Sequence, residues 1–426
     1  MVVNGFKIWT YEQIKEDKDK FEEVFDYIRM YGVHCMAYSI LQPKMNYFII
    51  DGIGIVAYGK LGPRGKTRYV LGDPLVARDN TEILLSMFLE VFPNSCFLQT
   101  SERVALILNK IKGMFMTIFG TETFLKNNGI KNYKLDEIRN EISNMEVELA
   151  ILENEKDKLY LRINESDNRK EFWHVKKKVH KLRENLKNLK VQAEDEEEKG
   201  FLYDFLSNEG RGFLRREYTL AEKEGLIVNE ADLNNINLDL LEAISNEWIK
   251  NNTMTKTENG FLTRPFIRES VLTNGRRLFI VKKANETIGF LELFPLYQND
   301  KVVGYYADII RTIKTIPHGT VNFLLLNAAD KIFKEGYEIY SLGLSPCHKT
   351  AKFNLEGESK RKDNPISTFI FKTVFDYGSF LYNAKGQAFH KERYRANTDL
   401  VFYCSNKTVP IGEVIGGFGV CGIKII

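Results

Sequence analysis

Hydrophobic and polar positions divide the chain into three stretches. Residues 1–130 mix short apolar runs with apolar positions at 3-4 spacing, which predicts an α/β unit. Its helices are "FEEVFDYIRMYG" and "TEILLSMFLEVF", while "NYFIIDGIGIVAYGKLGPRGKTRYVLGDPLV" predicts a pair of strands around a Gly/Pro turn. We interpret this stretch as one domain.

Residues 134–198 carry a longer-range pattern. Apolar residues recur at heptad spacing along two segments, which the polar stretch "NESDNRK" separates. The seam consists of Leu135, Ile138, Ile142, Met145, Leu149, Leu152, Leu159, Phe172, Val175, Val179, Leu182, Leu186 and Leu189. Two helices folded back through a turn explain both the seam and its interruption. We therefore predict an antiparallel coiled-coil hairpin with arms of about 40 Å.

The α/β character returns over residues 201–426. "LDLLEAISNEWIKNN" and "TVNFLLLNAADKIFKEG" predict helices, "RRLFIVKKANETIGFLELFPL" predicts a strand pair and "YEIYSLGL" predicts a strand. The order strand, strand, strand, helix, strand within residues 277–344 is how acyltransferases of the GNAT type are built. The predicted fold class is therefore α/β (α+β), with two tandem GNAT-like domains that share a groove, and the hairpin inserted between them.

Composition agrees with a globular protein and excludes several classes. Of 426 residues, 44% are hydrophobic and 27% charged, and only 10 are proline. Five scattered cysteines without CxxC spacing suggest neither disulfides nor a metal site. We find no signal peptide and no apolar run of about 18 residues that could span a bilayer. The sequence predicts a cytoplasmic protein and leaves peripheral membrane contact open.

Positive charge is concentrated on the second hairpin helix. A net charge of +3 is too small to indicate nucleic-acid binding by itself, so local clusters decide. The cluster comprises Lys176, Lys177, Lys178, Lys181, Arg183 and Lys187. Such a stripe can hold a phosphate backbone, or it can be an ordinary solvated helix face, and the sequence supports both equally.

Five motifs give the chain a resemblance to a known family. They are "YVLGDPLV", "SNEGRGFLRREYTLAEKEGL", "ISNEWIKNN", "ADIIRTIKTIPHGTVNFLLLNAADKIFKEGYEIYSLGLSP" and "LYNAKGQAFHKERY", in this order. Together they resemble the soluble aminoacyltransferase domain of phosphatidylglycerol lysyltransferases and alanyltransferases, which has the tandem GNAT-like fold. Departures include Asn322, where the family usually has aspartate, and Ala388, where arginine is usual.

The resemblance implies an enzyme that moves an aminoacyl group from charged tRNA to a hydroxyl or amine acceptor. A lipid headgroup, a small metabolite, a peptide or a cell-wall precursor would be the acceptor. Because aminoacyl-tRNA is already an activated ester, such an enzyme needs no cofactor, only positioning, proton transfer and oxyanion stabilisation. No metal, nucleotide or nucleophile-elbow motif is present in the sequence.

Asp308 and Arg311 are the leading catalytic candidates. By resemblance, Asp308 would hold the ammonium or side chain of the transferred amino acid, and Arg311 would bind the terminal phosphate of tRNA or orient Asp308. A separation of three places them on opposite faces of a regular strand, so a bulge or strand end at Ile309–Ile310 is required if both line one groove. The alternative is a structural Asp–Arg pair.

Further candidates surround these two. In "PHGTVNF", backbone N–H groups at Gly319 would meet a phosphate or oxyanion, and His318 is either a general base or a surface turn residue. Lys391, as a catalytic cation, and Arg393 would meet phosphate or carbonyl oxygen, or are simply solvated. Asp73 and Trp248 are interpreted as structural.

The remaining substrate contacts are predicted at both ends of the second α/β stretch. Tyr382 and Asn383 would hydrogen-bond the substrate, although a buried core tyrosine is equally plausible. Arg215 and Arg216 would contact tRNA, and since adjacent helical side chains diverge by about 100 degrees, only one need face the groove.

Two other functions fit the fold. An acyl-coenzyme A-dependent GNAT enzyme would need a pyrophosphate loop with Arg/Gln-x-x-Gly-x-Gly/Ala, and "RTIKTIPHGTV" lacks the second glycine. A non-catalytic binding protein would use the coiled hairpin as its working part.

Overall fold

The computed structural model describes residues 5–61, 66–127, 133–163, 166–232, 235–252, 260–262, 264–266, 275–351, 363–378 and 383–421. It divides into two compact units: residues 1–126 together with 209–426, and residues 127–208. We describe each unit by itself.

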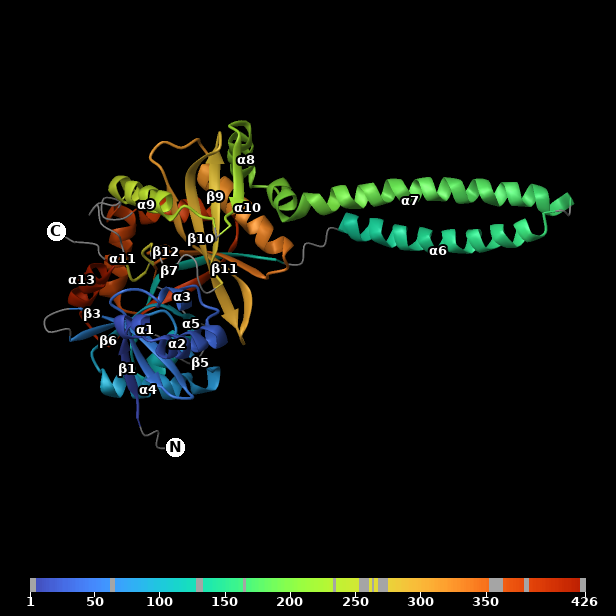
Figure 1. Ribbon diagram of the computed structural model, residues 1–426. Coiled ribbons are helices and arrows are strands. Elements are labelled where there is room, and N and C mark those ends of the chain that lie inside the picture. Colours follow the sequence, from blue (N-terminus) through green and yellow to red (C-terminus); the bar gives the residue numbers. More distant parts are fainter. Residues whose placement is uncertain are drawn as a thin grey trace. The chain divides into compact units, whose positions relative to one another are not determined.

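The larger unit is built on one sheet that runs through both predicted α/β stretches (Figure 1). Its strands are β1 (Lys7–Thr10), β2 (Asn46–Ile50), β3 (Gly54–Leu61), β4 (Thr67–Leu71), β5 (Leu75–Val76), β6 (Ser95–Ser101), β7 (Phe115–Lys126), β8 (Leu226–Glu230), β9 (Arg277–Lys283), β10 (Glu286–Gln298), β11 (Lys301–Thr312), β12 (Ile339–Pro346) and β13 (Asn397–Ser405). The order is β1-β2-β3-β4-β6-β13-β7-β12-β11-β10-β9-β8, with β5 paired to β3. The predicted mixed α/β fold class is confirmed.

Helices connect and cover these strands. They are α1 (Tyr11–Glu16), α2 (Lys18–Tyr31), α3 (Met36–Ser39), α4 (Thr81–Val91), α5 (Glu102–Lys112), α8 (Gly212–Lys223), α9 (Leu238–Asn252), α10 (Thr320–Lys334), α11 (Pro365–Tyr377), α12 (Ala384–Glu392) and α13 (Ile411–Val420), with a 3-10 turn at Arg78–Asn80. Several start at side-chain caps: Asp17 accepts from two N–H groups of α2, and Asn364 does so for α11.

The two halves of the sheet repeat one order of elements. Strands β2, β3 and β4, helix α4, strand β6, helix α5 and strand β7 correspond to β9, β10 and β11, α10, β12, the C-terminal helices and β13. Each half contains one parallel pair, β4 with β6 and β11 with β12. The halves exchange their last strands, since β13 pairs with β6 and β7 pairs with β12. The exchange joins both stretches into one body.

Alternating side chains bury both faces of the sheet. In β2, Phe48 and Ile50 pack into a cluster with Phe88 of α4, while Tyr47 and Ile49 belong to a second cluster on the opposite face. This accounts for the near-continuous apolar runs of the central strands, because neither face is left to solvent.

The smaller unit is a helical hairpin of α6 (Tyr133–Leu161) and α7 (Ser166–Ser207), visible in Figure 1. Ion pairs join Glu153 to Arg183 and Glu146 to Lys190. As one residue number rises the other falls, so the helices run antiparallel. The described seam residues are buried or half-buried, for example Ile138, whereas Val147 and Ile151 off the seam are exposed.

Candidate active site

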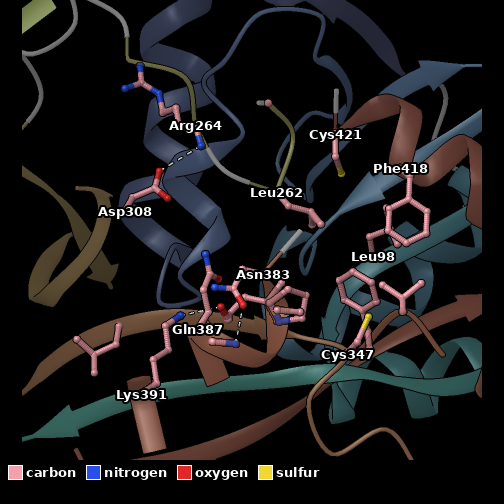
Figure 2. A pocket seen from close by; sticks show the side chains of 18 of the residues that line it. Leu98, Leu262, Arg264, Asp308, Cys347, Asn383, Gln387, Lys391, Phe418 and Cys421 are labelled. Atoms are coloured by element: carbon pink, nitrogen blue, oxygen red, sulfur yellow. Dashed lines mark hydrogen bonds between the residues drawn. The ribbon is translucent and has the colours of Figure 1, made fainter. Parts of the chain in front are cut away.

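A cavity of about 520 Å³ opens in the larger unit, lined by both halves of the sheet and by the C-terminal helices. Figure 2 shows two kinds of wall. Polar side chains on one side are Arg264, Asp308, Asn383, Gln387 and Lys391, and apolar side chains on the other are Leu98, Leu262 and Phe418 with Cys347 and Cys421. Gln387 and Asn383 are exposed, so the cavity opens to solvent beside them. The cavity therefore suits a substrate with a polar and an apolar part.

Asp308 enters this cavity because β11 bulges at that residue. In the pairing with β10, Ile309 lies opposite Glu292 and Ala307 opposite Leu293, so Asp308 is the extra residue. The bulge that the sequence required for Asp308 and Arg311 to share a groove thus exists, one position earlier than Ile309–Ile310. Both residues line the cavity.

Two donors hold the Asp308 carboxylate. The Tyr306 hydroxyl donates to Oδ1 at 2.8 Å. The backbone N–H of Arg264 donates to Oδ2 at 3.2 Å, and Figure 2 shows this bond as a dashed line. Gly343, at φ +75°, leaves room for the Tyr306 ring, which a Cβ there would meet directly. Burial outweighs these bonds and raises the pKa of Asp308 from 3.8 to about 6. A carboxylate so poorly solvated favours binding a cation.

Arg311 belongs to β11, and its guanidinium lies over an aromatic ring. Its guanidinium carbon is 4.0 Å from the ring centroid of Trp248, and both residues line the cavity. The interpretation of Trp248 as purely structural is therefore incomplete. Behind Arg311, the buried Glu292 pairs with Arg276 at 2.8 Å and lies 4.0 Å from Arg264, which fixes the guanidinium groups on this side.

Helix α12 supplies the third side of the cavity. Asn383 caps the helix by accepting from the N–H of Gly386 at 3.0 Å, and Ala384, Gln387 and Lys391 follow at 3-4 spacing on the cavity face. Lys391 donates to the carbonyl oxygen of Leu344 at 2.6 Å. Burial lowers its pKa from 10.5 to about 8. Lys391 is a cation at neutral pH that can lose its proton at modest cost.

Other predicted residues lie outside the cavity lining. The His318 side chain is 69% exposed and lies 3.3 Å from Glu217, a placement that does not support a general base in this cavity. Gly319 begins α10 at φ +85°, packed against the backbone of Glu217, so its amide region faces α8. The cavity residue next to it is Val321. The predicted Tyr382 lies outside the described residues.

The predicted phosphate-binding side chains are exposed. Arg215 and Arg216 both reach solvent from α8, and Arg393 lies over the ring of Phe213 at 3.8 Å. Sequence reasoning missed His390, which precedes Lys391 and lines the cavity. The sequence did offer one signal: His390 follows the predicted Asn383 by seven residues, which places both on the same face of a helix.

The basic side chains of the hairpin face solvent along α7. The predicted set Lys176, Lys177, Lys178, Lys181, Arg183 and Lys187 is exposed throughout. Arg183 pairs with Glu153 and Lys176 stacks on Trp173 at 4.6 Å, so part of the charge is used within the hairpin.

One group of side chains in the described residues could bind a metal ion. Donor atoms of His34, Cys35 and Glu122 lie within 4.8 Å of one another. Lys391 contributes positive charge near Cys35 and Glu122, which works against a cation there. The group is also stable without a metal: Nε2 of His34 lies 3.6 Å from Oε2 of Glu122, and burial raises the pKa of the Cys35 thiol, which keeps it neutral.

A family model matches about the same part of the chain that carries most of the motifs described above. Residues 202–405 match the family described as phosphatidylglycerol lysyltransferase, C-terminal. The predicted family resemblance is confirmed. The match includes Asp308, Arg311 and Lys391, and the family named is one of transferases. A search of curated proteins found no match.

Solved structures extend the likeness to the fold of the whole chain. The C-terminal domain of a putative lysylphosphatidylglycerol synthetase from Agrobacterium fabrum has a TM-score of 0.62 at 14% identity, covering 95% of this chain and 98% of that one. The L-PGS structure from Bacillus licheniformis has a TM-score of 0.60 at 16% identity, covering 95% and 97%. Within the described residues, no helix is long and apolar enough to cross a membrane.

Proposed function

We propose that this chain is an aminoacyltransferase that moves an aminoacyl group from charged tRNA to a hydroxyl or amine acceptor in the cytoplasm. The observation that carries the proposal is that one cavity is lined both by the ionisable carboxylate of Asp308 on β11 and by Lys391 on α12. Resemblance to phosphatidylglycerol lysyltransferases gives the reaction class.

Asp308 would bind the α-ammonium or side-chain ammonium of the transferred amino acid. A desolvated carboxylate gains more from a cation than an exposed one does, because water screens the pair less. Its two existing hydrogen bonds keep it aimed at the cavity. Arg311, whose guanidinium lies over the Trp248 ring, lines the same cavity and would meet a phosphate of the tRNA terminus.

Lys391 would stabilise charge on the reacting carbonyl. Its ammonium has three donors and spends one on Leu344, so donors remain for an oxyanion. No cofactor is needed for transfer from an ester that is already activated. The apolar wall near Phe418 and Leu262 would hold an apolar part of the acceptor. Lipid headgroups, small metabolites, peptides and cell-wall precursors remain the candidate acceptors, and a lipid would require peripheral membrane contact.

Positive side chains outside the cavity would bind the tRNA backbone. Arg215, Arg216 and Arg393 are exposed on the larger unit, and the lysine stripe is exposed on the hairpin. Binding of this kind rests on phosphate contacts and weakens as salt is raised.

The test supplies total tRNA charged with a radioactive amino-acid mixture, together with a cell extract as the source of acceptors. Ribonuclease-sensitive transfer of label, lost in Asp308→Ala, supports the proposal. Transfer of label from acetyl-coenzyme A would instead indicate a GNAT acyltransferase. Label from neither donor would indicate a binding protein.

A further inference from the structure

His390 lines the cavity, and contacts with neighbouring side chains fix the position of its imidazole. It lies on α12 immediately before Lys391 and lines the same cavity as Asp308. Its Nε2 lies 2.8 Å from Oδ1 of Asn322 on α10, and its ring is 5.7 Å from that of the buried Tyr394. The hydrogen bond at Nε2 thus fixes the position of the imidazole ring.

The neighbours of Asn322 determine which nitrogen of His390 carries the proton. The amide nitrogen of Asn322 donates to the carboxylate of Glu217, a group that only accepts. The amide oxygen therefore faces the other way, where it accepts from the Tyr394 hydroxyl at 2.6 Å and from Nε2 of His390. With its proton on Nε2, the neutral imidazole has a lone pair on Nδ1.

Two charged groups of the polar wall, Asp308 and Lys391, have other roles in the proposed reaction. Both oxygens of Asp308 accept hydrogen bonds, from Tyr306 and from the backbone of Arg264. Lys391 in its charged form has donors only. A nucleophile that enters the cavity must lose a proton, and the Nδ1 lone pair of His390 can accept it.

We propose that His390 is the general base of this cavity, acting through Nδ1, with Asn322 and Glu217 as positioning residues; this rests on the function proposed above. The proton of the acceptor O–H or N–H moves to Nδ1 as the freed electron pair bonds to the carbonyl carbon of the aminoacyl ester. When the intermediate collapses, the bond from that carbon to the ribose oxygen breaks. The proton on Nδ1 moves to the ribose oxygen, so the imidazole ends neutral.

The charges around His390 keep it unprotonated before reaction. Burial is the main cause, helped by the positive charges of Lys391 and Arg393, and together they lower its pKa from 6.5 to about 4. The other titratable groups packed nearby are Tyr394, on its own segment, and Glu217 of α8, which reaches it only through Asn322. The base is therefore in its working form throughout the neutral range.

Two measurements test the proposal. Nitrogen-15 NMR of the full chain, labelled at histidine, reports the tautomer, with His390→Gln identifying the signal by its loss. We expect a protonated Nε2 and an unprotonated Nδ1 at pH 7. A proton on Nδ1 would overturn the proposal, because Nδ1 would then be a donor and could not accept the proton of the nucleophile.

The activity test uses charged tRNA and cell extract as above. His390→Gln should lower kcat by about 10²–10⁴-fold with little change in KM, whereas the exposed His318→Gln is the matched control and should match wild type. Wild-type kcat in His390→Gln would refute the base. If wild type itself transfers nothing, the proposed function fails and the base role with it, while the NMR result still decides the tautomer.

Asn322→Asp separates a base from a merely structural histidine. A carboxylate beside Nε2 would stabilise the imidazolium and raise the pKa of His390. Activity at pH 6.5 relative to pH 8 should then fall below the wild-type ratio. An unchanged ratio in a folded variant with the new carboxylate would contradict the positioning role.

Discussion

The two halves of the sheet share one order of elements, but Asp73 in the first half and Asp308 in the second have opposite environments. In the first half, Asp73 follows β4 and accepts from both the backbone N–H and the hydroxyl of Ser101, at 2.8 and 2.6 Å. Ser101 in turn caps α5. In the second half, Asp308 is the bulged residue of β11 and faces a cavity. One carboxylate holds loops together, and the other is kept poorly solvated.

This contrast shows how a duplicated fold divides its tasks. A well-bonded carboxylate stabilises the protein, whereas a desolvated one costs stability and becomes useful for binding or catalysis. Because the halves exchange β7 and β13, strands of the first half pair with strands of the second beside the cavity, and Leu98 and Phe119 of the first half line it. The same substitution should therefore mainly reduce activity at Asp308 and mainly reduce stability at Asp73.

The largest expected effect is on activity in Asp308→Asn. The amide keeps the shape but cannot bind an ammonium ion through charge, so transfer should fall by at least about 100-fold. Asp73→Asn, assayed at equal concentrations of folded protein, is the matched control and should retain activity. Comparable losses in both variants would mean that the two halves do not differ as proposed.

The same variant should be more stable than wild type at pH 8. A carboxyl group with a raised folded-state pKa costs nothing while protonated, and the cost grows as pH rises from about 4 through about 6. At about 1.4 kcal/mol per pH unit between the two pKa values, the full cost is about 3 kcal/mol. Urea unfolding should show Asp308→Asn more stable by up to that amount at pH 8, with the advantage shrinking toward pH 4.

Wild-type activity should decline below about pH 6, because Asp308 must be ionised to bind a cation. The measurement is the pH profile of kcat/KM with charged tRNA. A profile that is flat down to pH 5 would show that the Asp308 charge is not used.

Arg311→Lys should have the next largest effect. Lysine keeps the positive charge but loses the flat stacking on Trp248 and the planar pair of donors. We expect about a 10- to 100-fold loss in kcat/KM, mostly through KM, in single-turnover and steady-state assays. A loss confined to kcat would place Arg311 at the reacting bond instead of the phosphate.

Asp73→Ala should act on stability alone. Removing the acceptor of both Ser101 bonds leaves its N–H and hydroxyl poorly satisfied, at a cost of about 2–4 kcal/mol. Thermal unfolding would show a lower Tm, while activity per folded molecule should stay near wild type. Reduced activity in the folded fraction would mean that the first half does more than support the cavity.

Local patterns in the sequence predicted several helices and strands and the need for a bulge near Asp308. However, residues 46–76, predicted as a pair of strands, contain the four strands β2, β3, β4 and β5. Helix α9 spans the predicted "LDLLEAISNEWIKNN" from end to end, and the separation of Asp308 from Arg311 was enough to require a bulge. These inferences depend on the 3.6-residue and two-residue periods, which are local properties. The Gly/Pro turn predicted after the first strands lies largely outside the described residues.

Contacts between distant segments could not be predicted in this way. Nothing in "NTDLVFYCS" indicates that β13 inserts between β6 and β7, because strand pairing depends on the whole topology. The same limitation hid His390, whose proposed role depends on contacts with Asn322 and Glu217 on two other helices. His318 and His390 both lie within motifs that resemble the family, so the sequence alone did not distinguish the exposed His318 from the cavity-lining His390.

The smallest expected effect concerns the hairpin. Lys177→Glu combined with Lys181→Glu reverses two exposed charges on α7, and should weaken tRNA binding several-fold at low salt because phosphate contacts are lost. Lys15→Glu combined with Lys18→Glu, which makes the same charge change at exposed positions of the larger unit, is the matched control.

If the hairpin binds tRNA, only the first pair of substitutions flattens the dependence of affinity on salt. If both pairs weaken binding equally, net charge explains the effect, and the stripe is a solvated face after all. Filter binding over a range of salt concentrations distinguishes the two outcomes.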